Sequence, residues 1–142
     1  MYFVDKNLLN TRLDYIEGLA ETIDTGNNLA LERACHMLIE ATVDVGNMII
    51  DAFILRDPGN YQDVLDILAQ EKVIGAEDAE KFKNTLAWRK ELTRNYQSID
   101  HDAMRAEFKQ NIDAYKNFKA SIEHFYENDP QAVTAFSGES DV

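Results

Sequence analysis

Apolar residues in this chain recur with the spacing of helices, and no segment shows the alternation of a strand. Over residues 5–23, apolar positions 9, 13, 16 and 20 share one face of a helix that Asp5 would cap. A longer helix is predicted over residues 29–55, and the sequence Asp57-Pro58-Gly59-Asn60 ends it. Its apolar stripe repeats at i, i+3, i+4 and i+7: Ala34, Met37, Leu38, Ala41, Val45, Met48 and Ile49.

The second half of the chain predicts three further helices. They cover residues 61–70, 76–92 and about 100–127, with an irregular stretch over 93–100 and a cap at Asp100. The last helix would turn one face inward, made by Met104, Phe108, Ile112, Tyr115, Ile122 and Phe125. We therefore predict an all-α, up-and-down four-helix bundle with an extra short helix. It forms one domain over residues 1–128, followed by a flexible acidic tail over 129–142.

Length and composition narrow the setting of the protein. With 142 residues, the chain fits one domain, and no apolar stretch approaches the roughly 20 residues that a membrane-spanning helix needs. The first residues have neither a basic start nor a long apolar run, so we expect a cytoplasmic protein. The single Cys35 lies in an apolar helical stretch and is expected to be a small core residue.

The charge of the chain is unevenly distributed. The net charge is −12, yet residues 81–119 hold nine of the fourteen basic residues and only five of the 26 acidic ones. This segment is therefore at +4, while the rest of the chain is at −16. A basic patch on an acidic protein is typical of a surface that binds RNA or an acidic partner, although two solvated helix faces would show the same composition.

The segment Trp88-Arg89-Lys90-Glu91-Leu92-Thr93-Arg94-Asn95-Tyr96 lies inside this basic region. It resembles the RxxxxHxY signature of the HepT-like ribonucleases, with Arg89 and Tyr96 in their places and Arg94 in the place of the histidine. Other blocks resemble the family in the same order, so that the likeness covers roughly residues 1–127: residues 31–34 and 40–50 in the second helix, 61–68 with 73–74 in the third, and 99–100 after the tyrosine.

The resemblance implies a HEPN-type helical bundle that forms a homodimer, with an RNA-cleaving cleft built from the motifs of both subunits. It also implies a cognate antitoxin of the minimal nucleotidyltransferase type, as in HepT–MntA pairs, which adds AMP to the motif tyrosine. In this chain Arg89 would clamp phosphate, Tyr96 would contact RNA and accept AMP, and Lys90 would support phosphate binding. No cofactor and no metal are expected.

A second registration of the motif remains open. Arg94 and His101 are separated by six residues, a spacing that a looser form of the motif permits. This registration would supply a histidine, but it puts Ala103 where the tyrosine belongs and places His101 at the start of the last helix. We prefer the registration with Arg89, Arg94 and Tyr96.

The arginine at position 94 limits the chemistry that we can expect. Metal-independent RNA cleavage needs a group that exchanges protons near neutral pH, which histidine does and arginine, always protonated, does not. Arg94 can still bind a phosphate. We therefore expect RNA binding with slow or absent cleavage by the motif. The alternatives are a non-catalytic HEPN module that binds a nucleotidyltransferase partner or a nucleotide, and a structural helical homodimer.

The long second helix carries a second polar series, made of Glu32, His36, Glu40, Asp44, Asn47 and Asp51. A di-iron site would need a Glu-x-x-His motif from each of two helices, which this chain lacks. Two interpretations remain: a solvated edge, or a position at the bundle or dimer seam where Asp44 and Asn47 pair with Arg89 or Arg94. Dimerisation is also suggested by apolar residues outside the main stripe, namely Val43, Ile50, Phe53 and Ile54.

Overall fold

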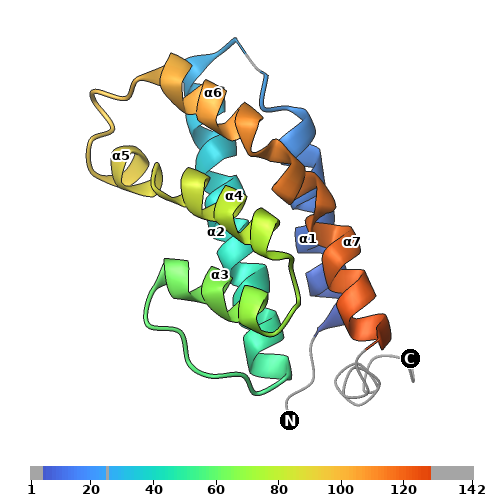
Figure 1. Cartoon of the computed structure of the whole chain (residues 1–142). Coiled ribbons are helices and arrows are strands. Elements are labelled where there is room, and N and C mark those ends of the chain that lie inside the picture. Colours follow the sequence, from blue (N-terminus) through green and yellow to red (C-terminus); the bar gives the residue numbers. More distant parts are fainter. Residues whose placement is uncertain (1–4, 25, 129–142) are drawn as a thin grey trace.

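The computed structural model describes residues 5–24 and 26–128, and within them every element of regular secondary structure is a helix (Figure 1). Seven helices follow one another: α1 (Lys6–Glu21), α2 (Asn28–Ala52), α3 (Tyr61–Gln70), α4 (Ala76–Leu86), α5 (Arg89–Thr93), α6 (His101–Gln110) and α7 (Ile112–Asn128). The predicted all-α class is confirmed. The predicted tail over 129–142 lies outside the described residues.

Helix α2 is the centre of the fold. It contacts α1, α3, α4, α5 and α6, and α1 and α7 lie side by side along one side of the molecule (Figure 1). Helices α3 and α4 pack on each other, and α4 also contacts α7, which closes the bundle. The short helix α5 lies at the edge of this assembly and contacts α2.

Side chains cap four of the helices at their N-termini. The side-chain oxygens of Asp5, Asn27, Asn60 and Asp100 each accept a hydrogen bond from a backbone N–H three residues later, at 2.8 to 3.0 Å. Each bond satisfies an N–H that has no partner inside its helix. The caps predicted at Asp5 and Asp100 are therefore confirmed, and α3 has the predicted bounds.

Two helices that the sequence predicts as continuous are broken. The segment 76–92 divides at Ala87-Trp88 into α4 and α5, and the segment 100–127 divides at Asn111 into α6 and α7. Asn111 is 3% exposed, and its side-chain amide donates to the Glu107 carbonyl at 2.8 Å and accepts from Asn84 Nδ2 at 3.1 Å. This buried side chain competes with the backbone for helical hydrogen bonds, which explains the break.

Three of the four residues in and directly after α2 that suggested a dimer are buried inside the single chain, so this basis for a dimer is wrong. Val43, Ile50 and Phe53 are at most 5% exposed within one chain, and only Ile54 remains exposed. Helix α2 also ends earlier than predicted, at Ala52, and Ile54 follows it with a φ of 53°. Gly46 serves packing inside the chain, because a Cβ there would lie 2.6 Å from Val64 Cγ1 of α3.

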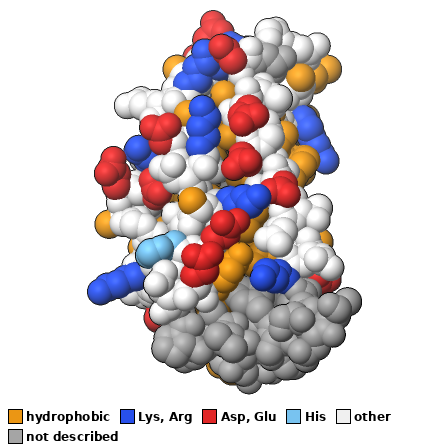
Figure 2. Space-filling model, turned by 90° about the vertical axis from the view of Figure 1, so that its right-hand side faces the viewer, with side chains coloured by type: hydrophobic (Ala, Val, Ile, Leu, Met, Phe, Trp, Pro, Cys, Tyr) orange, Lys and Arg blue, Asp and Glu red, His pale blue; other side chains and the backbone are white. Residues whose placement is uncertain are grey.

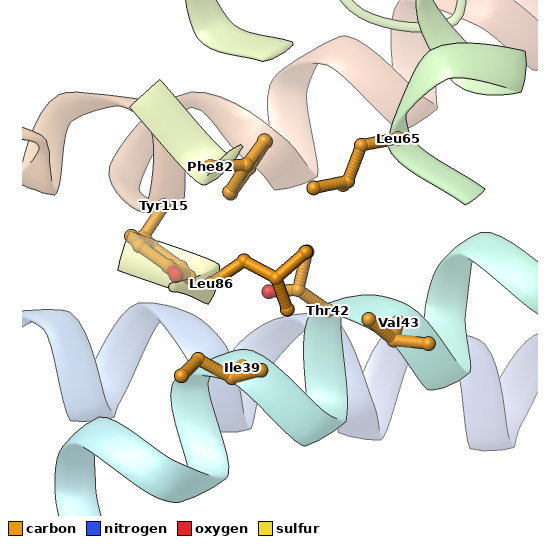
Figure 3. Close-up of a pocket in the computed structure, with 7 residues that line it drawn as sticks. All are labelled: Ile39, Thr42, Val43, Leu65, Phe82, Leu86 and Tyr115. Atoms are coloured by element: carbon orange, nitrogen blue, oxygen red, sulfur yellow. The ribbon is translucent and has the colours of Figure 1, made fainter. Parts of the chain in front are cut away.

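Aromatic rings fill the core between α4, α6 and α7. Phe82 packs edge-to-face against Tyr115 and Phe118, and the Tyr115 hydroxyl lies 2.6 Å from Thr85 Oγ1. Beside this cluster lies a cavity of about 10 Å³, lined by Ile39, Thr42, Val43, Leu65, Phe82, Leu86 and Tyr115 (Figure 3). That volume is at the lower limit for one water molecule, so the cavity is not a ligand site.

The surface over α1 and α7 mixes acidic and basic side chains and shows no large area of one sign (Figure 2). An ion pair between Lys119 of α7 and Asp14 of α1 spans these two helices. Among the described residues, no helix is long and apolar enough to cross a membrane. In the same residues, no group of three or more His, Cys, Asp and Glu side chains is placed to hold a metal ion.

Candidate nucleic-acid interface

The break after Leu86 places Arg89 at the first residue of α5, beside the middle of α2. Arg89 Nε donates to Glu40 Oε1 at 2.7 Å, and its guanidinium lies over the Tyr61 ring, 4.4 Å from the centroid. The Tyr61 hydroxyl donates to the other oxygen of Glu40 at 2.8 Å. Residues from α2, α3 and α5 thus hold the guanidinium in one orientation, as a preorganised anion site requires.

The hydrogen bonds among Glu40, Tyr61 and Arg89 favour one protonation state for each of the three groups. Burial alone would raise the pKa of Glu40, but the hydrogen bonds from Arg89 and Tyr61 hold it below its usual range. The hydrogen bond to Glu40 raises the pKa of Tyr61 and that of Arg89. Glu40 is therefore a carboxylate at neutral pH, and it binds two groups that keep their protons.

His36 belongs to the same cluster. It precedes Glu40 by one turn of α2, and its Nε2 lies 3.3 Å from the Oε1 atom that also binds Arg89. The His36 side chain is 30% exposed and the Arg89 side chain 42%, so solvent reaches both. We call His36, Glu40, Tyr61 and Arg89 the Glu40 cluster.

The second arginine of the motif and its tyrosine lie outside the Glu40 cluster. Arg94 follows the last residue of α5, and its backbone N–H donates to the Lys90 carbonyl at 2.9 Å. Lys90, Arg94 and Tyr96 are exposed, Tyr96 by 65%. Within the described part of the chain, none of the three side chains has a hydrogen bond or an ion pair with another residue. They are free to contact a ligand.

The histidine of the other registration lies along the same edge of α2. His101 begins α6, and its Nε2 lies 2.7 Å from Glu32 Oε2, two turns before Glu40 on α2. Both partners are 23% exposed. The predicted polar series of α2 is therefore no purely solvated edge, because Glu40 binds Arg89 of one motif registration and Glu32 binds His101 of the other.

Comparison with known proteins identifies the family of the chain. A family model for HepT-like ribonucleases ("Ribonuclease HepT-like") matches residues 12–122. The chain belongs to the HepT-like ribonuclease family. A protein of Bacillus subtilis (strain 168) named "Putative RNase YutE" is 35% identical over 96% of this chain and 99% of its own length. The solved structure of YutE, described as a cytosolic protein of unknown function, has a TM-score of 0.86 over 96% of this chain and all of that one.

For this HepT-like chain, the predicted pairing of Asp44 and Asn47 with the arginines is not found. Arg89 pairs with Glu40 instead, one turn earlier on α2, and no hydrogen bond or ion pair of Asp44 or Asn47 occurs among the described residues. Asp44 acts only at longer range, where its charge helps to raise the pKa of Tyr61. Glu40 was part of the polar series, but the sequence alone does not say which member meets Arg89.

The basic segment of the HepT-like chain is not one continuous patch either. Six of its nine cations form ion pairs: Lys81 with Glu77, Lys83 with Asp66, Arg89 with Glu40, Arg105 with Asp102, Lys109 with Asp24 and Lys119 with Asp14. Within the described residues, the cations without such a partner are Lys90, Arg94 and Lys116. Two of these three, Lys90 and Arg94, lie four residues apart on α5 and directly after it, so the available positive charge of this segment is concentrated beside Tyr96.

Proposed function

We propose that this HepT-like protein binds RNA at α5 and is the ribonuclease toxin of a two-protein toxin–antitoxin system. The observation that carries the proposal is the exposed group of Lys90, Arg94 and Tyr96 in a chain whose other described cations are mostly ion-paired. Cations bind the phosphates of single-stranded RNA, and an exposed aromatic ring stacks on a base. The Arg89 guanidinium, held by Glu40 and Tyr61, adds a fixed phosphate contact beside them.

Cleavage by the motif alone is expected to be weak. Arg94 occupies the place of the motif histidine, and an arginine donates hydrogen bonds without exchanging protons at neutral pH. This substitution favours the alternative function, a non-catalytic HEPN module that binds a nucleotidyltransferase partner or a nucleotide.

The antitoxin in this proposal is a nucleotidyltransferase of the MntA type that transfers AMP to Tyr96. The support in this chain is that the Tyr96 side chain is 65% exposed and has no hydrogen bond within the described residues. An AMP group there would place a phosphate next to Lys90 and Arg94, where it would compete with RNA for the same cations. Modification would therefore block RNA binding.

The experiment that tests RNA binding measures the affinity for a labelled single-stranded RNA against salt concentration. Removing one cation that binds a phosphate should reduce the salt slope of the binding constant by about 0.7. We expect this reduction for Lys90→Ala and for Arg94→Ala. Lys116→Ala is the matched control, because Lys116 is an exposed cation of α7 with no ion pair among the described residues. Equal effects of all three variants would mean diffuse attraction. No RNA binding by the wild type would leave the two alternatives, a module that binds a nucleotidyltransferase partner or a nucleotide and a structural homodimer.

A further inference from the structure

The motif lacks a histidine, yet an imidazole lies beside its first arginine. Oε1 of Glu40 is 2.7 Å from Arg89 Nε and 3.3 Å from His36 Nε2. One carboxylate oxygen thus accepts a hydrogen bond from a guanidinium of α5 and lies 3.3 Å from an imidazole of α2, and both side chains reach solvent. This combination places an anion-binding group next to an imidazole, the side chain that most often serves as a general base.

We propose that His36 is the catalytic base for RNA cleavage by this protein, and that Glu40 is the residue that positions it. The proposal rests on the proposed function, since it requires RNA to bind at α5. It changes the expectation for catalysis: cleavage does not depend on a histidine at position 94, because a residue of α2 takes that role.

The reaction balances without a metal or cofactor. His36 takes the proton of a ribose 2′-OH, and the resulting oxygen attacks the adjacent phosphorus. The bond from phosphorus to O5′ breaks, and water supplies the proton that O5′ takes. The products are a 2′,3′-cyclic phosphate and a 5′-hydroxyl, and His36 returns its proton to solvent. Arg89 stabilises the charge that develops on the phosphate.

The geometry of the Glu40 cluster fits these roles. Arg89 has five N–H donors, of which the one on Nε is used by Glu40, and its side chain is 42% exposed. His36 contacts Glu40 through Nε2, which leaves Nδ1 for a substrate. The charged group in contact with His36 is Glu40, which also binds Tyr61 of α3 and Arg89 of α5. One turn before His36 on α2, Glu32 binds His101 of α6.

The other two histidines are less suited to this role. His101 is held by Glu32 at 2.7 Å at the start of α6, and its partner carboxylate is not the one that binds Arg89. His124 is exposed on α7, where its ring contacts Asn128 of the same helix. His36 alone among the three shares a carboxylate with the motif arginine.

The test measures binding and cleavage of a labelled single-stranded RNA by wild-type protein, His36→Ala and His36→Gln. General acid–base catalysis contributes about 10²–10⁴-fold, so we expect a loss of that size in cleavage with RNA affinity unchanged within about threefold. Added imidazole should restore part of the activity of His36→Ala, which a purely structural role would not allow. His124→Ala is the matched control, and a DNA of the same sequence, which lacks the 2′-OH, should not be cut. Thermal melting verifies that each variant is folded.

The role of Glu40 is tested by a double variant. Glu40→Gln should lower the cleavage rate, and adding it to His36→Ala should cause a smaller further loss than in the wild type, because His36, one of the two residues that Glu40 contacts, is already absent. Full activity of both His36 variants would overturn the proposal, and so would wild-type protein that binds RNA without cutting it. Either result would leave RNA binding intact, whereas wild-type protein that binds no RNA would refute the proposed function itself.

Discussion

The Arg94 side chain is exposed after the last turn of α5 and has no hydrogen-bond or ion-pair partner among the described residues. A histidine at this position would therefore disturb no packing and would restore the family motif. Because His36 is proposed to supply the base in the wild type, we expect a gain in the His36→Ala background, where Arg94→His should increase RNA cleavage by about 10²–10⁴-fold, the usual contribution of an acid–base group.

A gel assay of RNA cleavage measures this gain, and Arg94→Lys serves as the control that keeps the charge without the imidazole. The gain should persist in Arg94→His with His101→Ala, because His101 belongs to the other registration. Loss of cleavage in His101→Ala of the protein that keeps Arg94 would show instead that the spacing from Arg94 to His101 is the working motif.

A second prediction at the residue scale concerns the contribution of Glu40 to the free energy of unfolding. Its pKa is held below the ordinary value of 4.5 by Arg89 and Tyr61 against the effect of burial. A carboxyl with a lowered folded pKa stabilises the protein above its unfolded pKa, and this contribution is lost as the pH falls through the folded pKa. We expect Glu40→Gln to lower the free energy of unfolding at pH 7 by about 1–3 kcal/mol.

Urea unfolding at several pH values checks this prediction. The difference between wild type and Glu40→Gln should narrow below about pH 4.5, which is the ordinary pKa of the group. Asp102→Asn is a suitable control, because the Asp102 side chain is 97% exposed and its ion pair with Arg105 is expected to contribute little. A difference that stays constant with pH would mean that the Glu40 charge contributes nothing.

At the scale of elements, the C-terminus of α2 contains a strained residue. Leu55 N–H bonds to the Ile50 carbonyl at 2.9 Å and Ile54 N–H to the Asp51 carbonyl at 3.4 Å, the two bonds of a Schellman motif. Ile54 takes the left-handed position with a φ of 53°, where glycine is usual and a β-branched residue is disfavoured.

Because Ile54 is 60% exposed, replacing it removes little packing. Ile54→Gly should stabilise the protein by about 1 kcal/mol, and Lys72→Gly, at the equivalent position after α3 with a φ of 60°, should act in the same direction. Thermal unfolding measures both. Asp51→Gly, an exposed residue inside α2, is the contrasting control and should destabilise.

Gly46 and Gly18 form a matched pair of glycines inside helices. Alanine favours a helix by about 1 kcal/mol over glycine, so Gly18→Ala in α1, where nothing lies within 4 Å of the added Cβ, should stabilise. At Gly46 the Cβ would meet Val64 Cγ1 at 2.6 Å and Leu68 Cδ1 at 3.3 Å. The stiff Val64 side chain leaves little room to adjust, so Gly46→Ala should destabilise by about 1–3 kcal/mol in the same unfolding assay. A stabilised Gly46→Ala protein would show that α3 can move away.

The starts of helices were predictable from the sequence, and the breaks within them were not. Asp5, Asp100 and the turn before Tyr61 are local signals that act through their own backbone neighbours. Apolar periodicity continues through Asn111, so the sequence predicts one helix there. The break depends on the Asn84 amide of α4, a contact that exists only after the helices pack.

At the scale of the molecule, the site also combines features that are visible in the sequence with contacts that only the packing of helices creates. The motif and its departure at Arg94 are visible in the sequence, as is the polar series of α2. The pairing of Arg89 with Glu40 instead of Asp44 is set by where α5 meets α2. The +4 charge of the basic segment is likewise only a count along the sequence, because the fold pairs most of its cations with carboxylates. Three of these carboxylates lie outside the segment, on α1, on α3 and in the turn after α1.

The last prediction concerns the assembly, because the family's composite cleft requires two copies of this chain. Val43, Ile50 and Phe53 are buried inside one chain, so they no longer favour a dimer. The exposed motif still favours a dimer. If two subunits form one cleft, the segments after α5 of both subunits must face each other. We therefore expect a dimer at micromolar concentration in analytical ultracentrifugation, with the two copies of this segment close together.

The distance between the two motif segments of a dimer can be measured with thiol-reactive spin labels, because Cys35 does not interfere. It is the single cysteine of the chain, fully buried, and burial raises its pKa to about 12, so it will not compete for a thiol reagent. A spin label on Gln97→Cys, an exposed position next to Tyr96, should give one short distance between subunits. Asn117→Cys on α7 is the comparison position and should give a longer one. A monomer in the centrifuge would refute the composite cleft, whereas a dimer with distant labels at position 97 would place the two motifs on separate faces.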